Sequence, residues 1–281
     1  MATDHPPDVQ RTDQEAVSGK IESLSYTRLP HGIRCGHEFP LEGQVDFTVS
    51  AKEGIPVEVT LELFLEGRSI GKKAKESAKL GGSAIFSPIV LVCREDGDRC
   101  YLNHPERAMR QLTAEVTLRK DDQVLDQRTF QGPYIRCMKT SGIADVELFA
   151  PETIECEDED TIQVVAHYLA FPEDRIRKIE ISLDTGQGPF ETAGRKVITD
   201  IKSGHASVEA EPLTVRARCW KNSPEDKTCR LKIGSVSSVR NMEWVRGSAI
   251  MYFEDGTQRG GLSPRPGKLV RCGTKLPEIP L

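Results

Sequence analysis

The chain has 281 residues, of which 37% are hydrophobic and 29% charged, and its formal net charge is −5. This length and composition are typical of a soluble protein with two domains. The acidic balance argues against a nucleic-acid partner, whose phosphates select clustered Lys and Arg, and no apolar run approaches the ~20 residues that span a bilayer. We therefore expect neither a nucleic-acid partner nor a membrane-spanning segment.

The first 20 residues differ in composition from the rest of the chain. They are rich in Asp, Gln, Thr and Pro. A segment with so little apolar content cannot bury enough surface to offset the entropy lost on ordering. We therefore expect a disordered N-terminal lead over residues 1–20.

Alternation of apolar and polar residues dominates the remainder of the chain. This period of two predicts half-buried strands. The clearest of them cover residues 45–51, 57–65, 84–93, 162–169, 176–184 and 213–218. No apolar pattern with the period of a helix persists for three turns. The sequence therefore predicts an all-β fold.

The eight cysteines form two sets with similar spacing. The first set is Cys35, Cys93, Cys100 and Cys137, and the second set is Cys156, Cys219, Cys229 and Cys272. Successive spacings are 58, 7 and 37 residues in the first set and 63, 10 and 43 in the second. Each set ends in an apolar residue, an arginine and the last cysteine. We therefore predict one duplicated domain, at residues 21–140 and 145–276, with a short linker at 138–144.

One stretch of the second repeat carries a resemblance. Residues 179–190 (IEISLDTGQGPF), followed by residues 213–218 (LTVRAR), resemble the central strands of fibronectin-III-like and immunoglobulin-like domains. The resemblance implies two tandem β-sandwiches stapled by disulfides. It implies no functional residue, because such sandwiches mostly bind, space or scaffold.

Cysteines at repeated spacings favour disulfides and an oxidising compartment, so we expect the chain outside the cell, on its surface or in the periplasm. Four cysteines allow three pairings. We favour disulfides between the cysteines that are close in sequence, Cys93–Cys100 and Cys219–Cys229. This leaves Cys35–Cys137 and Cys156–Cys272 as the other two bonds. A four-cysteine zinc site in each domain is the alternative, but the spacings of seven and ten residues fit zinc knuckles poorly.

Other candidate ligands are weaker. The acidic run Glu157, Asp158, Glu159 and Asp160 offers hard oxygens for Ca²⁺, with a solvated turn as the favoured interpretation. His31, Cys35 and His37 offer nitrogen and sulfur, but the matching loop of the second repeat has no His, so we favour a surface loop. His167 lies in an alternating strand and is interpreted as a core or edge residue.

No catalytic motif is present, so we predict a protein that is not an enzyme and needs no cofactor. Paired aspartates lie in turns, and the Gly-Gly pairs lack the Lys-Ser/Thr of a phosphate loop. We expect an exported binding, adhesion or spacer module with a protein or cell-surface partner, contacted through residues 94–110 and 223–246. The alternatives are a structural subunit of an extracellular or secretion assembly and an intracellular zinc adaptor.

Overall fold

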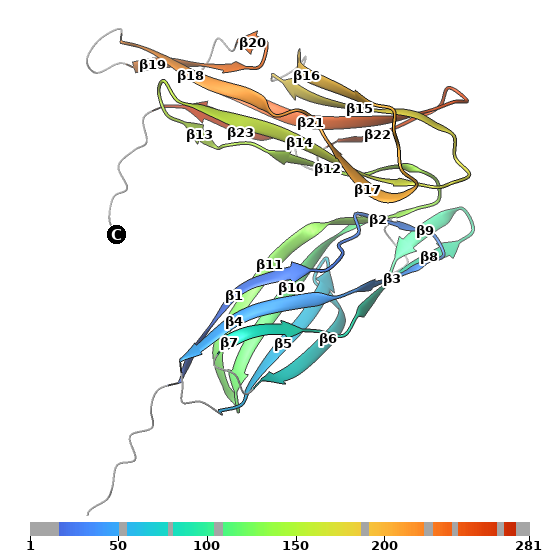
Figure 1. The fold of residues 1–281 in the computed structure, drawn as a ribbon, viewed down its shortest axis with the longest axis vertical. Helices are drawn as coiled ribbons and strands as arrows, with labels where there is room; N and C mark the ends of the chain where they lie inside the picture. Colours follow the sequence, from blue (N-terminus) through green and yellow to red (C-terminus); the bar gives the residue numbers. More distant parts are fainter. Residues whose placement is uncertain are drawn as a thin grey trace, which may run out of the picture. The chain divides into compact units, whose positions relative to one another are not determined.

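A computed structural model describes residues 17–50, 55–77, 81–103, 109–186, 191–221, 227–237, 241–262 and 267–273. Every regular element within these ranges is a β-strand (Figure 1). None of the described residues forms a helix that is long and apolar enough to cross a membrane. The prediction of an all-β chain is therefore confirmed.

The chain divides into two compact units that are each built from several segments. Unit 1 contains Met1–Leu29, Pro40–Val90 and Leu112–Gly132, and unit 2 contains Pro30–Phe39, Leu91–Gln111 and Pro133–Leu281. These boundaries differ from those of the predicted repeats, because three stretches of residues 21–140 belong to unit 2. The division into two tandem repeats stays a prediction.

Unit 1 contains two antiparallel layers. One has the order β1-β4-β7, formed by Ser18–Tyr26, Gly43–Ser50 and Gly81–Ile85. The other has the order β11-β10-β5-β6, formed by Gln123–Met138, Met109–Lys120, Val57–Leu65 and Arg68–Ser77; residues 133–138 of β11 and 109–111 of β10 belong to unit 2. Their inner faces bury alternate residues, such as Val45 and Phe47 on β4 and Leu61 and Leu63 on β5. A Cβ on Gly43 would lie 2.6 Å from Leu61, so the layers pack as a sandwich.

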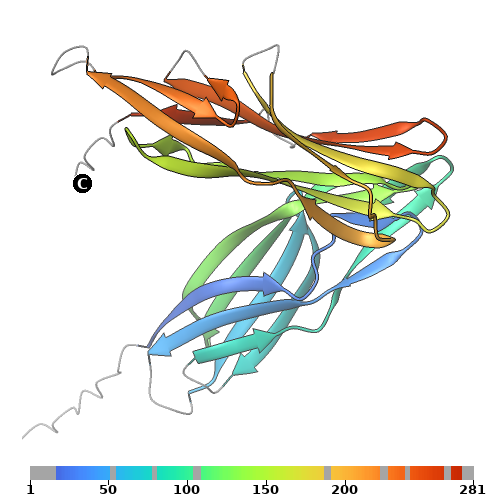
Figure 2. The ribbon, with the colours of Figure 1, turned by 45° about the horizontal axis from the view of Figure 1, so that its top comes forward.

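Unit 2 contains two larger sheets (Figure 2). The first has the order β12-β14-β18-β19-β20, with β17 also paired to β14, over Gly142–Phe149, Glu159–Ala170, Leu213–Lys221, Lys227–Ile233, Val236–Ser237 and Gly204–Glu209. The second has the order β13-β23-β21-β15-β16, with β22 paired to β21, over Thr153–Ile154, Lys268–Cys272, Met242–Phe253, Ile176–Thr185, Glu191–Ile198 and Gln258–Leu262. Side chains of both sheets share one apolar core, which makes a second sandwich.

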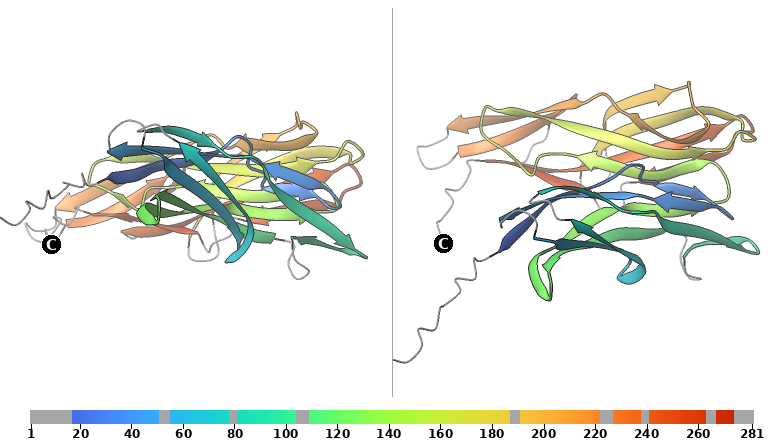
Figure 3. Two further views of the ribbon diagram at one scale, coloured as in Figure 1. Left: turned by 90° about the horizontal axis from the view of Figure 1, so that it is seen from below. Right: turned by 60° about the horizontal axis from the view of Figure 1, so that its bottom comes forward.

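Four short strands complete the fold. Strand β2 (Gly32–Arg34) pairs in parallel with the end of β11, with Cys137 opposite Ile33. Strands β3 (Glu38–Leu41), β8 (Ile89–Asp96) and β9 (Arg99–Leu102) form a small sheet of their own. Figure 3 shows the twist of the strands from two further directions.

All eight cysteines form disulfides, but the favoured pairing is wrong. The bonds are Cys35–Cys100, Cys93–Cys137, Cys156–Cys219 and Cys229–Cys272. Cys219 and Cys229 do lie opposite each other on β18 and β19, yet each bonds to a cysteine outside this strand pair. The bonds close loops of 43 to 65 residues, so chain entropy assigns about 4 kcal/mol to each. The all-β, disulfide-stapled sandwich is thus confirmed with a different connectivity.

Three further expectations change. Residues 1–16 of the predicted lead lie outside the described residues, whereas Ser18–Tyr26 is strand β1. The predicted linker is packed, because Met138 and Ala144 share a buried cluster with Leu169 and Phe171. The predicted contact loops are largely strand, since β8, β9, β19, β20 and β21 cover most of their described residues.

Candidate functional site

Three histidines and two carboxylates meet on one face of β12, β14 and β17 in unit 2. Asp145 on β12 lies opposite His167 on β14, and Glu147 follows two residues later on the same face. His205 on β17 lies opposite Leu169, two residues along from His167. His31 comes from the segment before β2 and covers this face. We call these five residues the histidine cluster.

The cluster occupies the outer face of its sheet. The neighbours of His167 along β14, Ala166 and Tyr168, point into the apolar core of unit 2. Because side chains alternate along a strand, His167 points away from that core. Alternation thus explains why a histidine stands within an otherwise apolar strand.

His31 is held from three sides. Its side chain is 8% exposed, and its Nδ1 lies 3.2 Å from Oδ2 of the buried Asp145. Its ring stacks on that of His167, with 3.5 Å between the ring centroids and 6° between the planes. Its backbone N–H donates to Nε2 of His205 at 3.1 Å. The expected surface loop at His31 is therefore a buried, fixed position.

A glycine makes this approach possible. A Cβ on Gly32 would lie 2.9 Å from Sδ of Met138 and 3.1 Å from Cβ of Ala144. Only a residue without a side chain fits at that distance without moving its neighbours. Nearby, the guanidinium of Arg34 lies 4.4 Å from the ring centroid of Phe171 and pairs with Glu173 at 2.6 Å. The segment that carries His31 is thus anchored at the residues that follow it.

The second acid–imidazole pair is more exposed than the first. Nε2 of His167 lies 3.2 Å from Oε2 of Glu147. The geometry of this contact is not that of a hydrogen bond, and the buried Nε2 has no other hydrogen-bond partner among the described residues. The side chain of His167 is 13% exposed and that of Glu147 is 36% exposed. The cluster is therefore reachable from the carboxylate side.

Electrostatics match this geometry. The adjacent imidazole of His167 lowers the pKa of Glu147. Desolvation, followed by the neighbouring His31 and His167, lowers the pKa of His205 to about 4. A neutral His205 suits its role, because its Nε2 accepts the N–H of His31.

A second charged feature lies on the outer face of β18 and β19. Arg216 faces Lys232 across the two strands, and Arg218 faces Arg230. All four residues are exposed. We call them the basic ladder. A hollow of about 340 Å³ adjoins it, lined by Pro212, Leu213, Thr214, Arg216, Arg218, Lys232 and Gly234.

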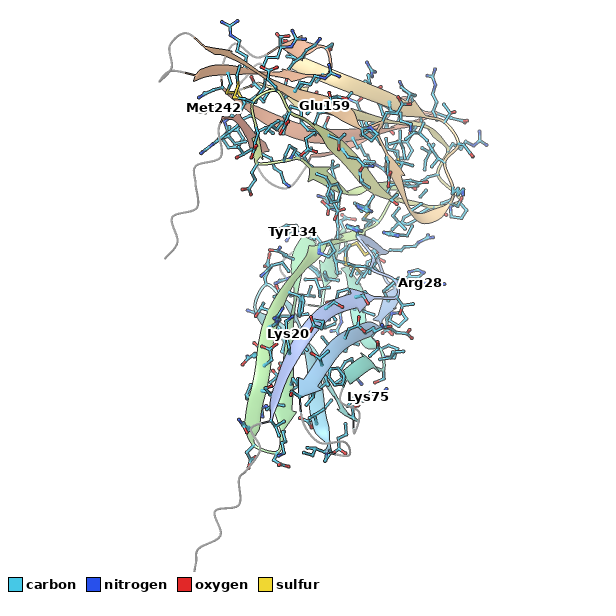
Figure 4. All side chains as sticks on the ribbon, turned by 60° about the vertical axis from the view of Figure 1, so that its left-hand side comes forward. Lys20, Arg28, Lys75, Tyr134, Glu159 and Met242 are labelled. Carbon is cyan, nitrogen blue, oxygen red and sulfur yellow. A yellow bond between two sulfur atoms is a disulfide. The ribbon has the colours of Figure 1, made fainter. Side chains whose placement is uncertain are left out.

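The carboxylate oxygens of the acidic run next to the basic ladder do not converge on one point. Oε1 of Glu157 accepts the N–H of Cys219 at 3.0 Å, and Oε2 of Glu159 lies 2.5 Å from Nε of Arg216. Asp160 accepts the N–H of Thr161. Figure 4 labels Glu159, which stands on β14 beside β18. The structure thus divides the predicted Ca²⁺ ligands among separate partners.

The remaining candidates are also placed. Nδ1 of His37 lies 3.2 Å from the carbonyl oxygen of Cys35, whose sulfur is in a disulfide, so these two do not join His31 as ligands. Asp121 lies in the tight turn between β10 and β11 with a positive φ of 50°. This turn position explains the aspartate without a catalytic role.

Sequence reasoning missed Glu147 and His205 and set His167 aside. Each fits the alternation of its strand, so nothing in the local pattern distinguishes it from an ordinary surface residue. Within the described ranges, the set of metal-binding side chains that converges is His31, Glu147 and His167, with one donor atom of each within 4.8 Å of the others. These residues are separated by 116 and 20 positions in the chain, and pairing of β12 with β14 brings two of them together.

No family model matches the chain, and no curated protein matches it significantly. The disulfides, the histidine cluster and the basic ladder are therefore the features that indicate a function.

Proposed function

We propose that the chain is an exported binding module that contacts anionic groups at a cell surface through the basic ladder. The observation that carries the proposal is the pairing of cation with cation on β18 and β19. Like charges directly opposite each other on neighbouring strands are destabilising. An anionic partner would offset that repulsion, whereas a face serving only solubility would gain from mixed charges.

The disulfides support the location. Four disulfides within one chain are typical of proteins in an oxidising environment and rare in the cytosol. Periplasm, cell surface and extracellular space all meet this condition. We place the protein there as a tandem, immunoglobulin-like or fibronectin-III-like scaffold without catalytic activity.

The ladder also has the shape of a docking surface. Its cations project from two long strands that are held by the core of unit 2 and by Cys156–Cys219 and Cys229–Cys272. A rigid face loses little conformational entropy on binding. Glu159 contacts Arg216 at one border of the ladder, so Arg218 and Lys232 are the cations that we expect to contribute most.

Retention of the full chain on heparin-agarose, measured as the salt concentration of elution, tests the proposal. The variant Arg218→Gln/Lys232→Gln should bind about 2- to 30-fold more weakly, because each exposed ion pair contributes about 0.2–1 kcal/mol. The matched control is Lys72→Gln/Lys75→Gln on β6, which removes the same charge from two other exposed lysines. Equal losses in both variants would mean that net charge, not the ladder, causes retention.

A further inference from the structure

We propose that His31, Glu147 and His167 bind a divalent transition-metal ion of the zinc type. The donor set supports this ion class. Two imidazoles and one carboxylate form a common set of three protein ligands for Zn²⁺, with a fourth position left open. Ca²⁺ and Mg²⁺ prefer sets made of oxygen alone. All eight thiols are committed to disulfides, so nitrogen and carboxylate oxygen are the donors that this chain retains for such an ion.

Distances support one shared ion. One donor atom from each of the three side chains lies within 4.8 Å of the others. Ligand bonds of about 2.0–2.2 Å in a tetrahedral site place two donors about 3.3–3.6 Å apart, so the most widely spaced donors must move about 1 Å closer together. All three residues belong to unit 2 and therefore to one compact body.

Asp145 supplies the supporting contact that metal-bound histidines usually have. A histidine that binds a metal through one ring nitrogen donates its other N–H to a carboxylate or carbonyl group. Here Nδ1 of His31 contacts Oδ2 of Asp145 at 3.2 Å, and Asp145 is 8% exposed. This contact leaves Nε2 of His31 for the ion.

The unpaired nitrogen of His167 points to the same conclusion. A buried polar atom without a partner is unfavourable and calls for an explanation. Nε2 of His167 makes no well-directed hydrogen bond among the described residues, although it lies 3.2 Å from the carboxylate of Glu147. A metal ion between the two groups would satisfy both.

Binding should also change the stack of the two rings. The parallel rings of His31 and His167 hold their nitrogen lone pairs side by side rather than aimed at one point. An ion shared by both rings must therefore splay them. The His31 segment, β12 and β14 would then be joined by a bond in addition to their packing.

Titration of the full, oxidised chain with Zn²⁺, followed by calorimetry, tests the site. One ion should bind per chain. Co²⁺ in its place should give the visible absorption of a site with nitrogen and oxygen ligands. The variants His167→Gln and Glu147→Gln should each weaken binding at least about tenfold. His37→Gln, which removes an exposed histidine of the same unit, should bind as the parent does.

Asp145→Asn tests the supporting contact separately. It should weaken Zn²⁺ binding about 10- to 100-fold while leaving one site per chain. Thermal unfolding without metal shows whether each variant is folded, and Glu147→Gln is the mildest change because Glu147 is partly exposed. No stoichiometric binding by the parent chain, or equal loss in His37→Gln and His167→Gln, would overturn the proposal. Neither result depends on the heparin experiment.

Discussion

The two cysteine sets begin alike and end differently. In each set, a short strand just before the first cysteine pairs in parallel with the strand that carries the last cysteine. The residue two positions before the first cysteine therefore faces the last one: Ile33 faces Cys137, and Ile154 faces Cys272. In each, the residue after the first cysteine has a positive φ, 78° at Gly36 and 68° at Glu157. Yet the first set joins its first and third cysteines, whereas the second joins its first and second.

A displacement of two residues explains the difference. In the first set, Cys93 accepts a hydrogen bond from the N–H of Gly36 and donates one to His37. In the second set, Ala217 makes both of the corresponding bonds, with Glu157 and Asp158. Cys219 therefore lies two residues beyond the position of Cys93. A shift of two keeps a side chain on the same face of a strand but moves it to another neighbour.

The new neighbours follow from the register. Cys100 lies opposite Glu95, and Cys229 lies opposite Cys219. Cys219 occupies the position that Glu95 has in the first set, and there it bonds to Cys156. Cys229, which occupies the position of Cys100, then bonds to Cys272. Equal cysteine counts and similar spacings thus do not determine the disulfide connectivity, because a shift of one cysteine by two residues along its strand is enough to exchange the bonding partners.

The sharpest way to test this comparison is to move the displaced cysteine. The double variant Ala217→Cys/Cys219→Ala should convert the second set to the pairing of the first. The introduced thiol should bond to Cys272, and Cys156 should bond to Cys229. Peptide mapping under non-reducing conditions reads the result directly. Retention of Cys229–Cys272 in this variant would show that something other than the register selects the partners.

Deleting one bond from each set compares their contributions to stability. Cys93–Cys137 and Cys229–Cys272 span 44 and 43 residues, so chain entropy predicts nearly equal losses of about 4 kcal/mol for the paired Ala variants. Chemical denaturation of the Cys93→Ala/Cys137→Ala and Cys229→Ala/Cys272→Ala chains measures both. A clear inequality would mean that native packing around one bond matters more than loop length.

The turn after the first cysteine should give the smallest effect. Gly36→Ala places a Cβ at φ 78° and should destabilise the chain by about 1 kcal/mol. Glu157→Gly relieves the same strain, but it loses the hydrogen bond from Cys219 to Oε1 and gains chain entropy in the unfolded state. We expect a net change near zero for Glu157→Gly. Two equal destabilisations in denaturant melts would contradict this difference.

The sequence predicted the strands well, because burial on one face of a sheet leaves a period of two that is read locally. It did not predict the disulfide partners. The partners depend on which strands lie next to each other, as when Cys137 meets Ile33 more than 100 residues away. The spacing of the cysteines indicated a duplicated domain, but it carried no information on how β18 is aligned with its neighbouring strands.

The histidine cluster shows the same limit. His31 attracted notice only through its neighbours Cys35 and His37, which the structure uses elsewhere. Its actual partners are Asp145 and His167, and their proximity follows from the pairing of β12 with β14. Gly32, whose missing side chain admits His31, could be identified only once Met138 and Ala144 were placed beside it.

The connectivity has a consequence for how the chain matures. In an oxidising compartment entered N-terminus first, Cys35 and Cys93 arrive before Cys100, so the earliest bond available to the first set is not a native one. The second set bonds in order of arrival, Cys156 with Cys219 and then Cys229 with Cys272. Correction of a wrong bond requires thiol–disulfide exchange. This exchange takes seconds to hours, depending on the oxidant and on whether an isomerase is present. The first set should therefore depend on a disulfide isomerase, while the second can mature with an oxidant alone.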